Sequence, residues 1–167
     1  YIQLDSIRYG EPSVHFLLRD AAEATCIEEI RDRLSGTSSA SAFSLNVFDA
    51  KTRRAYSVEQ LYDQTDVFEI TDRYAHTNHL RRLGTGYARE GSDTKPRLET
   101  ALRLLAALDA SGATIADIRS TLDYVDPEDR LRSVYSDPAT DASPTGATML
   151  IDSESDEIRV IDRFSGV

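Results

Sequence analysis

The polar side chains that could do chemistry gather in one short run, HTNHL at residues 76–80. The pattern predicts a strand that ends at Asn78, which places the asparagine amide where a strand gives way to a loop. An amide in that position can point its NH₂ group into a cleft, as an oxyanion-hole donor in acyl transfer must do. Periodicity by itself favours a plainer interpretation, an ordinary polar exit from a strand. The residues alone therefore leave both interpretations open.

The histidines of this run and the one cysteine of the chain offer two other kinds of chemistry. His76 and His79 are three positions apart, which places them on opposite faces of a strand, and no third ligand for a metal is evident. Cys26 is predicted to lie inside an amphipathic helix on its apolar side, where a small buried thiol is the usual outcome. We therefore predict no metal site, no cofactor, no disulfide and no nucleophilic role for Cys26.

Two arginines in the second half of the chain are candidates for binding the carboxylate of a substrate. Arg130 and Arg132 lie in a stretch that is predicted to be irregular. Lys51 and Lys95 are the only lysines among the 19 basic residues, so arginine is the common surface cation of this chain. Because exposed arginines are mostly solvated, the sequence favours a surface role for both.

The composition limits the classes of partner. The 167 residues carry a net charge of −10, which argues against nucleic-acid binding, since that depends on Lys and Arg neutralising phosphates. No apolar stretch approaches the roughly 20 residues that span a bilayer, so no membrane partner is predicted. One cysteine fits a reducing, cytoplasmic setting. Because the chain begins at Tyr1 and its only methionine is Met149, we expect it to be part of a longer protein.

The first half of the chain is predicted to form two helices followed by strands. Helical spacing runs from residue 12 to residue 34 in two pieces, the second beginning with Thr25 as N-cap and Glu28 completing a capping box. Period-2 alternation then predicts strands at residues 42–48, 55–61, 67–70 and 74–78. Connections this short favour an antiparallel meander, because parallel pairs need long crossovers.

The second half is predicted to form two more helices and a final hairpin. One helix follows Pro96 with an apolar stripe to residue 108, and Thr114 with Asp117 forms the capping box of another. Strands at residues 147–151 and 158–161 close the chain. We predict a single domain over residues 1–167, of α+β class, with helices covering one face of an antiparallel sheet.

Several stretches resemble a known family when they are taken together in order. They are VHFLLRDAAEATCIEEIRDRL, SAFSLNVFDAKTRRAYSVE, YAHTNHL, PRLETALRLLAAL and GATMLIDSESDEIRV. Their order over nearly the whole chain resembles the later portion of the isopenicillin N acyltransferase-like (acyl-CoA:6-aminopenicillanate acyltransferase) family of N-terminal-nucleophile hydrolases. The resemblance implies an αββα sandwich, of which this chain would be the C-terminal portion.

The resemblance also implies a mechanism. A precursor cuts itself before a cysteine, whose thiol then attacks an amide or thioester carbonyl while its free α-amine serves as general base. By the resemblance, Asn78 is the oxyanion donor and His76, Thr77, His79 and Glu59 support it or orient the substrate. The family's nucleophile lies upstream of this chain. We therefore expect an upstream segment or subunit as partner, and a small acyl amide or thioester as substrate.

Two alternatives stay open at this stage. The bile-salt hydrolase and penicillin V acylase branch shares the chemistry, without the HTNHL context. A non-catalytic, truncated relative that acts as a binding or assembly module is the other possibility. The acyl group, the acceptor and the balance between hydrolysis and transfer do not follow from the residues, since they depend on pocket side chains that come partly from outside this chain.

Overall fold

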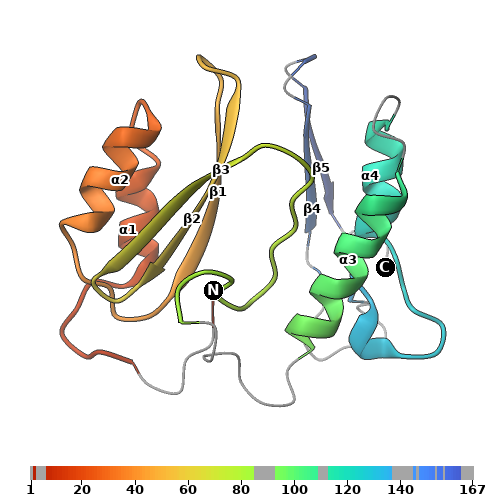
Figure 1. The fold of residues 1–167 in the computed structure, drawn as a ribbon, viewed down its shortest axis with the longest axis horizontal. Coiled ribbons are helices and arrows are strands. Elements are labelled where there is room, and N and C mark those ends of the chain that lie inside the picture. Colours follow the sequence, from red (N-terminus) through yellow and green to blue (C-terminus); the bar gives the residue numbers. More distant parts are fainter. Residues whose placement is uncertain are drawn as a thin grey trace. The chain divides into compact units, whose positions relative to one another are not determined.

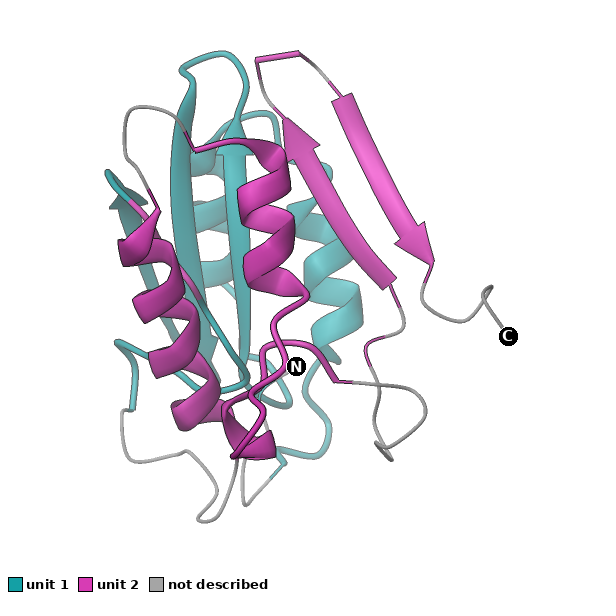
Figure 2. Cartoon of the chain, turned by 90° about the vertical axis from the view of Figure 1, so that its right-hand side faces the viewer, with its two compact units in different colours: residues 1–72, 76–92 teal, residues 73–75, 93–167 magenta. Residues whose placement is uncertain are grey.

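The computed structural model describes residues 2, 7–84, 93–108, 113–136, 145, 147–152, 154–155 and 157–162. The chain forms two compact units (Figure 2). Unit 1 comprises residues 1–72 with 76–92, and unit 2 comprises residues 73–75 with 93–167. The single domain over residues 1–167 stays a prediction.

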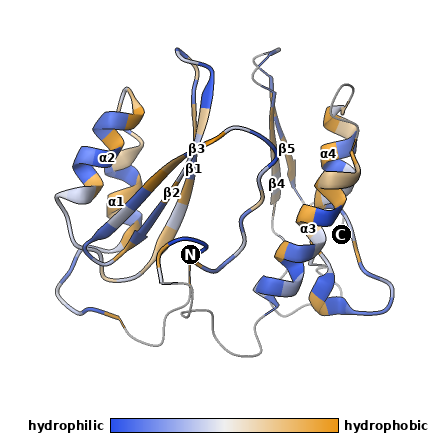
Figure 3. Ribbon diagram, viewed as in Figure 1, coloured by the Kyte–Doolittle hydropathy of each residue, from blue (hydrophilic) through white to orange (hydrophobic). Residues whose placement is uncertain are grey.

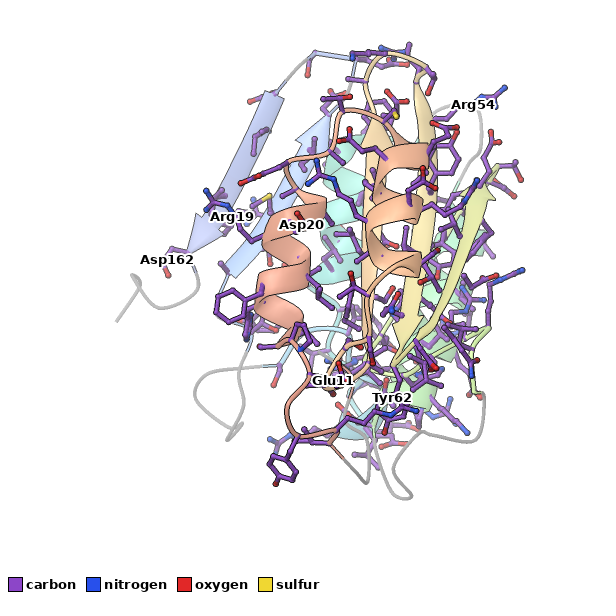
Figure 4. The ribbon with its side chains drawn as sticks, turned by 90° about the vertical axis from the view of Figure 1, so that its left-hand side faces the viewer. Glu11, Arg19, Asp20, Arg54, Tyr62 and Asp162 are labelled. Carbon is purple, nitrogen blue, oxygen red and sulfur yellow. The ribbon has the colours of Figure 1, made fainter. Side chains whose placement is uncertain are left out.

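Two helices of unit 1 confirm the helical pair predicted near the start of the chain. Helix α1 spans Val14–Ala21 and helix α2 spans Ile27–Ser35 (Figure 1). Ser13 caps α1, because its hydroxyl accepts a hydrogen bond from the His15 N–H at 3.4 Å. The guanidinium of Arg33 on α2 binds the carboxylate of Asp20, which is labelled on α1 in Figure 4, at 2.9 Å.

The predicted start of the second helix is wrong by one residue. Helix α2 begins at Ile27 with Cys26 as its N-cap, so the predicted capping box of Thr25 and Glu28 does not form. Instead the Glu29 carboxylate accepts hydrogen bonds from the Thr25 N–H at 2.8 Å and from its hydroxyl at 3.2 Å. Because Cys26 precedes the helix, its side chain is exposed, and the prediction of a buried thiol inside the helix is also wrong.

Three strands of unit 1 form the predicted antiparallel meander. They are β1 (Phe43–Asp49), β2 (Arg54–Leu61) and β3 (Gln64–Ile70), in the order β1-β2-β3. The turn after β1 closes on Asp49, whose carboxylate accepts the N–H groups of Lys51 at 2.9 Å and Thr52 at 3.3 Å. The fourth strand, predicted at residues 74–78, is absent from the described structure.

The helices of unit 1 cover one face of this sheet. Val58 at the centre of β2 is fully buried in a core cluster with Leu17 of α1 and Ile30 and Leu34 of α2. Because successive side chains of a strand point to opposite faces, Glu59 points away from the helices. Figure 3 shows hydrophobic and hydrophilic residues on both helices, as expected where one side of each meets the sheet.

Unit 2 contains the remaining elements. They are α3 (Thr94–Ala107), α4 (Ile115–Leu122), the 3₁₀ helix η1 (Arg130–Arg132), and the antiparallel pair β4 (Ala147–Asp152) and β5 (Glu157–Asp162). The capping box of Thr114 and Asp117 is confirmed. Helices combined with antiparallel sheets in both units confirm the α+β class.

The β4–β5 hairpin has one covered face and one open face. Thr148 and Leu150 are buried. The alternate side chains are apolar and exposed in two cross-strand pairs, Met149 with Val160 and Ile151 with Ile158. Within the described residues, no helix has both the length and the apolar character needed to cross a membrane.

Candidate active site

A carboxylate lies in the middle of the unit 1 sheet. Glu59 belongs to β2, and its neighbours across the sheet are Ser44 on β1 and Asp66 on β3. Its side chain is 0% exposed. A buried charge is costly unless hydrogen bonds replace the water that it loses. The partners of Glu59 are therefore the first feature of the site.

Four donors from one later segment surround the Glu59 carboxylate. Oε1 accepts hydrogen bonds from the His76 ring at 3.1 Å and from the backbone N–H of Arg81 at 2.6 Å. Oε2 accepts the backbone N–H groups of Arg82 and Leu83, both at 2.9 Å. Three consecutive backbone N–H groups thus converge on one carboxylate. The segment from His76 to Leu83, called the anchored segment below, is tied to the sheet through the Glu59 side chain.

The charge state of Glu59 follows from the balance between burial and hydrogen bonding. Burial acts to raise its pKa, but the hydrogen bonds from His76 and from the N–H groups of Arg81, Leu83 and Arg82 outweigh burial and lower the pKa from 4.5 to about 2. The carboxylate is therefore ionised at neutral pH. Since an ionised carboxylate has only acceptor atoms, His76 donates from Nε2, which sets its tautomer in the neutral state.

The two histidines lie next to each other rather than on opposite sides. Their ring centroids are 6.4 Å apart with an interplanar angle of 29°. The Thr77 hydroxyl and the His79 Nδ1 lie 3.1 Å apart, within hydrogen-bonding distance. The predicted placement on opposite faces of a strand is wrong, because no strand forms here and the period of two does not apply. No group of three or more His, Cys, Asp or Glu residues in the described part of the chain could hold a metal ion.

Side chains anchor the same segment at two further points. Leu80 is 3% exposed and belongs to a second core cluster with Ile2, Ala42 and Leu61. The guanidinium of Arg82 forms an ion pair with Asp66 and lies over the ring of Phe68, 4.7 Å from its centroid. The anchored segment therefore has polar, ionic and apolar attachments, all within unit 1.

Asn78 lies between these attachments and is exposed. Two residues before it, His76 binds Glu59, and two residues after it, Leu80 enters the core. A residue flanked so closely by fixed points has little backbone freedom. Such an amide can act as a donor whose orientation is set before a reaction begins, which is what stabilisation of a developing oxyanion requires.

The structure thus brings together all five residues that the sequence singled out: Glu59, His76, Thr77, Asn78 and His79. Sequence reasoning missed the backbone N–H groups of Arg81, Arg82 and Leu83, which supply three of the four donors to Glu59. Nothing in the sequence could have indicated them, because every residue except proline carries a backbone N–H.

Cys26 is not part of this arrangement. It borders a cavity of about 190 Å³ that is lined by residues 24–27, Ile30 and residues 47–51. Ile30 belongs to the core cluster between the helices and the sheet, which places this cavity on the helix-covered face. Because Glu59 points to the other face, the sheet separates the Cys26 thiol from the anchored segment.

Comparison with protein families matches residues 6–160 to the family described as acyl-coenzyme A:6-aminopenicillanic acid acyl-transferase. Comparison with curated proteins and with solved structures finds no match. The family match covers most of the chain and includes the whole anchored segment and Glu59. It confirms the resemblance on which the role of Asn78 depends. The chain belongs to the acyl-coenzyme A:6-aminopenicillanic acid acyl-transferase family, and its function at the level of that family is acyl transfer.

Proposed function

We propose that this chain is the later portion of a cysteine N-terminal-nucleophile enzyme, an acyltransferase or amidohydrolase that acts on amide or thioester bonds through an acyl-enzyme. One observation carries the proposal: the segment around Asn78 is anchored on a fully buried, ionised carboxylate. Burying a carboxylate costs free energy, and a surface loop without a function does not require such an anchor. Family membership supports the same reaction class.

Each residue has a role in this proposal. The Asn78 amide donates a hydrogen bond to the oxyanion that forms when the carbonyl is attacked. Glu59 holds the anchored segment, and His76 links Glu59 to the residues next to Asn78. His79 and Thr77 pair with each other, 3.1 Å apart, and fix the turn on either side of Asn78. Thr77 and His79 are also the two sequence neighbours of Asn78, and in this proposal they orient the substrate.

The nucleophile comes from an upstream segment or subunit in this proposal. An N-terminal cysteine uses its own free α-amine as general base, whereas the nitrogen of Cys26 is tied up in a peptide bond. Cys26 also lies across the sheet from the anchored segment, as its place beside the helix-covered cavity indicates. The upstream cysteine would become free when the precursor cuts its own chain.

The unit 1 sheet fits one half of an αββα sandwich. Its helices cover one face, and the other face carries buried polar residues of β2, Ser57 and Glu59. In a sandwich of this kind the second face meets another sheet, so both faces of a central strand are buried. Five consecutive residues of β2, from Ser57 to Leu61, are buried, and the anchored segment supplies part of the cover on the second face through Leu80 and the N–H groups that bind Glu59.

The reaction balances through two steps. The thiolate sulfur bonds to the substrate carbonyl carbon, the C–N or C–S bond breaks, and the leaving amine or thiol takes the proton first removed from the cysteine thiol. Water or an amine then attacks the acyl-enzyme, and the thiol regains a proton. The acyl group ends on water in hydrolysis and on the amine in transfer.

Intact-mass spectrometry of the complete protein with a small acyl thioester tests the proposal. We expect the mass to rise by one acyl group, carried by a peptide outside residues 1–167. The variant Cys26→Ser should be acylated to the same extent, because Cys26 lies across the sheet from Asn78. Acylation at Cys26 would overturn the assignment of the nucleophile. An absence of any acylation would favour a non-catalytic binding or assembly module.

A further inference from the structure

Strand β1 forms one edge of the unit 1 sheet, and within the described part of the chain no strand lies along its outer side. An edge strand presents a row of unpaired backbone N–H and C=O groups, onto which another strand can pair. Folded proteins commonly protect such an edge with charged residues, proline or a bulge. The residues of the edge therefore indicate whether it is built to stay free.

The β1 edge carries none of these protections over its first six residues. Residues 43–48 read FSLNVF, without a charged residue or a proline, and their pairing with β2 is continuous and contains no bulge. The opposite edge of the sheet differs, because Asp66 and Glu69 place two charges within β3, a strand of the same length. Of the two edges, β1 is thus the one that suits pairing with a further strand.

The backbone just before β1 shows which groups of the strand point outwards. The Ala40 carbonyl accepts the N–H of Arg8 at 2.9 Å, and the Ala42 carbonyl accepts the N–H of Ile2 at 3.4 Å. Both donors belong to the N-terminal stretch and not to β2. Backbone groups of successive residues in an antiparallel strand point to alternate sides. The residues of β1 whose N–H and C=O groups point outwards are therefore Ser44, Asn46 and Phe48.

The N-terminal stretch also sets the direction of a further strand. Ile2 and Ala42 form an isolated antiparallel bridge. Ile2 is 1% exposed and belongs to the core cluster that contains Ala42, Leu61 and Leu80. In an antiparallel pair, each step back along one strand meets one step forward along the other. Chain that precedes the bridge is therefore directed along the outer side of β1, starting beside the core cluster that holds Leu80 of the anchored segment.

We propose that the upstream segment of this protein pairs with the outer side of β1 as an antiparallel strand. The inference rests on the acyl-transfer proposal, which includes a segment upstream of residue 1. The bridge fixes the register: the residue immediately before Tyr1 faces Ser44, and the third residue before Tyr1 faces Asn46. Main-chain hydrogen bonds provide the affinity in strand addition of this kind. The pairing joins the upstream segment to the same sheet that anchors residues 76–83.

Disulfide cross-linking in the complete protein tests the register. One cysteine replaces Asn46, whose side chain is exposed, and a second replaces the third residue before Tyr1, in a Cys26→Ser background. Opposite residues of a hydrogen-bonded antiparallel pair have Cα atoms about 5.5 Å apart, a distance that a disulfide spans. We expect this bond to form on oxidation and to appear in peptide maps by mass spectrometry. A cysteine one residue further upstream points to the opposite face of the sheet and should cross-link at least about tenfold less.

The cross-linking outcomes separate the occupants of the edge. Equal cross-linking at the two upstream positions would overturn the register, and no cross-linking at either would overturn the strand. Dimers linked through Asn46→Cys of two chains would show that a second copy occupies the edge, which would also overturn the proposal. Acylation of an upstream cysteine is measured separately. A protein that is acylated but lacks the cross-link would keep the proposed function and lose this inference.

Amide hydrogen exchange of the complete protein, read at single residues by NMR, tests the pairing without any substitution. The outward N–H groups of Ser44, Asn46 and Phe48 should exchange as slowly as those of Leu45 and Val47, which point towards β2. A free edge would give the opposite result, with fast and slow exchange alternating along β1. Such alternation would contradict the proposal.

Discussion

Replacing Asn78 by alanine in the complete protein is expected to lower the turnover number for acyl transfer by about 10²–10³-fold. The amide is proposed to bind the oxyanion only as it forms, so its loss should lower kcat and kcat/KM together and leave KM nearly constant. The side chain is exposed, and neither the hydrogen bonds to Glu59 nor the burial of Leu80 involves it. The free energy of unfolding should therefore change little.

A matched control exists for this substitution. Asn46 on β1 is the only other asparagine of the chain and is also exposed. Asn46→Ala should retain the turnover of the wild type, which separates loss of the donor from a general effect of removing a surface amide. Steady-state kinetics with one acyl substrate and chemical denaturation of each variant provide the two readouts. Turnover of Asn78→Ala at the wild-type level would remove Asn78 from the mechanism.

Replacing Glu59 by glutamine is expected to have the largest effect on stability, a loss of about 3 kcal/mol. Truncating one partner of a buried, hydrogen-bonded charge typically costs about 3–5 kcal/mol. The glutamine carboxamide would place its NH₂ group where a Glu59 oxygen now accepts hydrogen bonds. At least one N–H group that now binds Glu59 would then face another donor instead of an acceptor. The anchored segment should loosen, and turnover should fall although Glu59 touches no substrate. Urea denaturation and steady-state kinetics measure the two effects.

Glu29→Gln removes the same negative charge as Glu59→Gln at a different place in unit 1, so it is the control for the loss of charge. Hydrogen bonds from the Thr25 backbone and from Arg33 outweigh burial and lower the pKa of Glu29 to about 2 as well. Glu29 lies at the first turn of α2 and has no contact with the anchored segment in the described structure. We expect this variant to keep wild-type turnover. Equal loss of turnover in both variants would show that charge, and not the anchoring of residues 76–83, is responsible.

The pH dependence of stability gives a further test of Glu59. Its pKa falls from 4.5 in the unfolded chain to about 2 in the folded one, so the folded state favours the ionised form. The corresponding stability, about 3 kcal/mol, is fully present above pH 4.5 and is lost as the pH falls towards 2. The difference in unfolding free energy between wild type and Glu59→Gln should therefore narrow over that range. A difference that stays constant would contradict the role of the ionised carboxylate.

Local patterns in the sequence were sufficient to predict most of the helices and strands. The spacing of apolar residues predicted α1 and α2, and period-2 alternation predicted β1, β2 and β3, because each signal is complete within one segment. Thr114 and Asp117 form the expected capping box for the same reason, since both partners lie within four residues. The start of α2 was wrong because Thr25 has two acidic residues within reach, and only the geometry decides that Glu29 accepts its hydrogen bonds.

The sequence by itself determined the four α-helices, the three strands of the antiparallel meander, the final strand pair and, through the ordered family resemblance, the set of residues around Asn78. Tertiary structure decided how that set works. Glu59 receives N–H groups from residues 22 to 24 positions further along the chain, a pairing that no local pattern encodes. The fourth strand that alternation predicted at residues 74–78 does not form in the described structure, and the His76 ring of this stretch binds the same buried carboxylate.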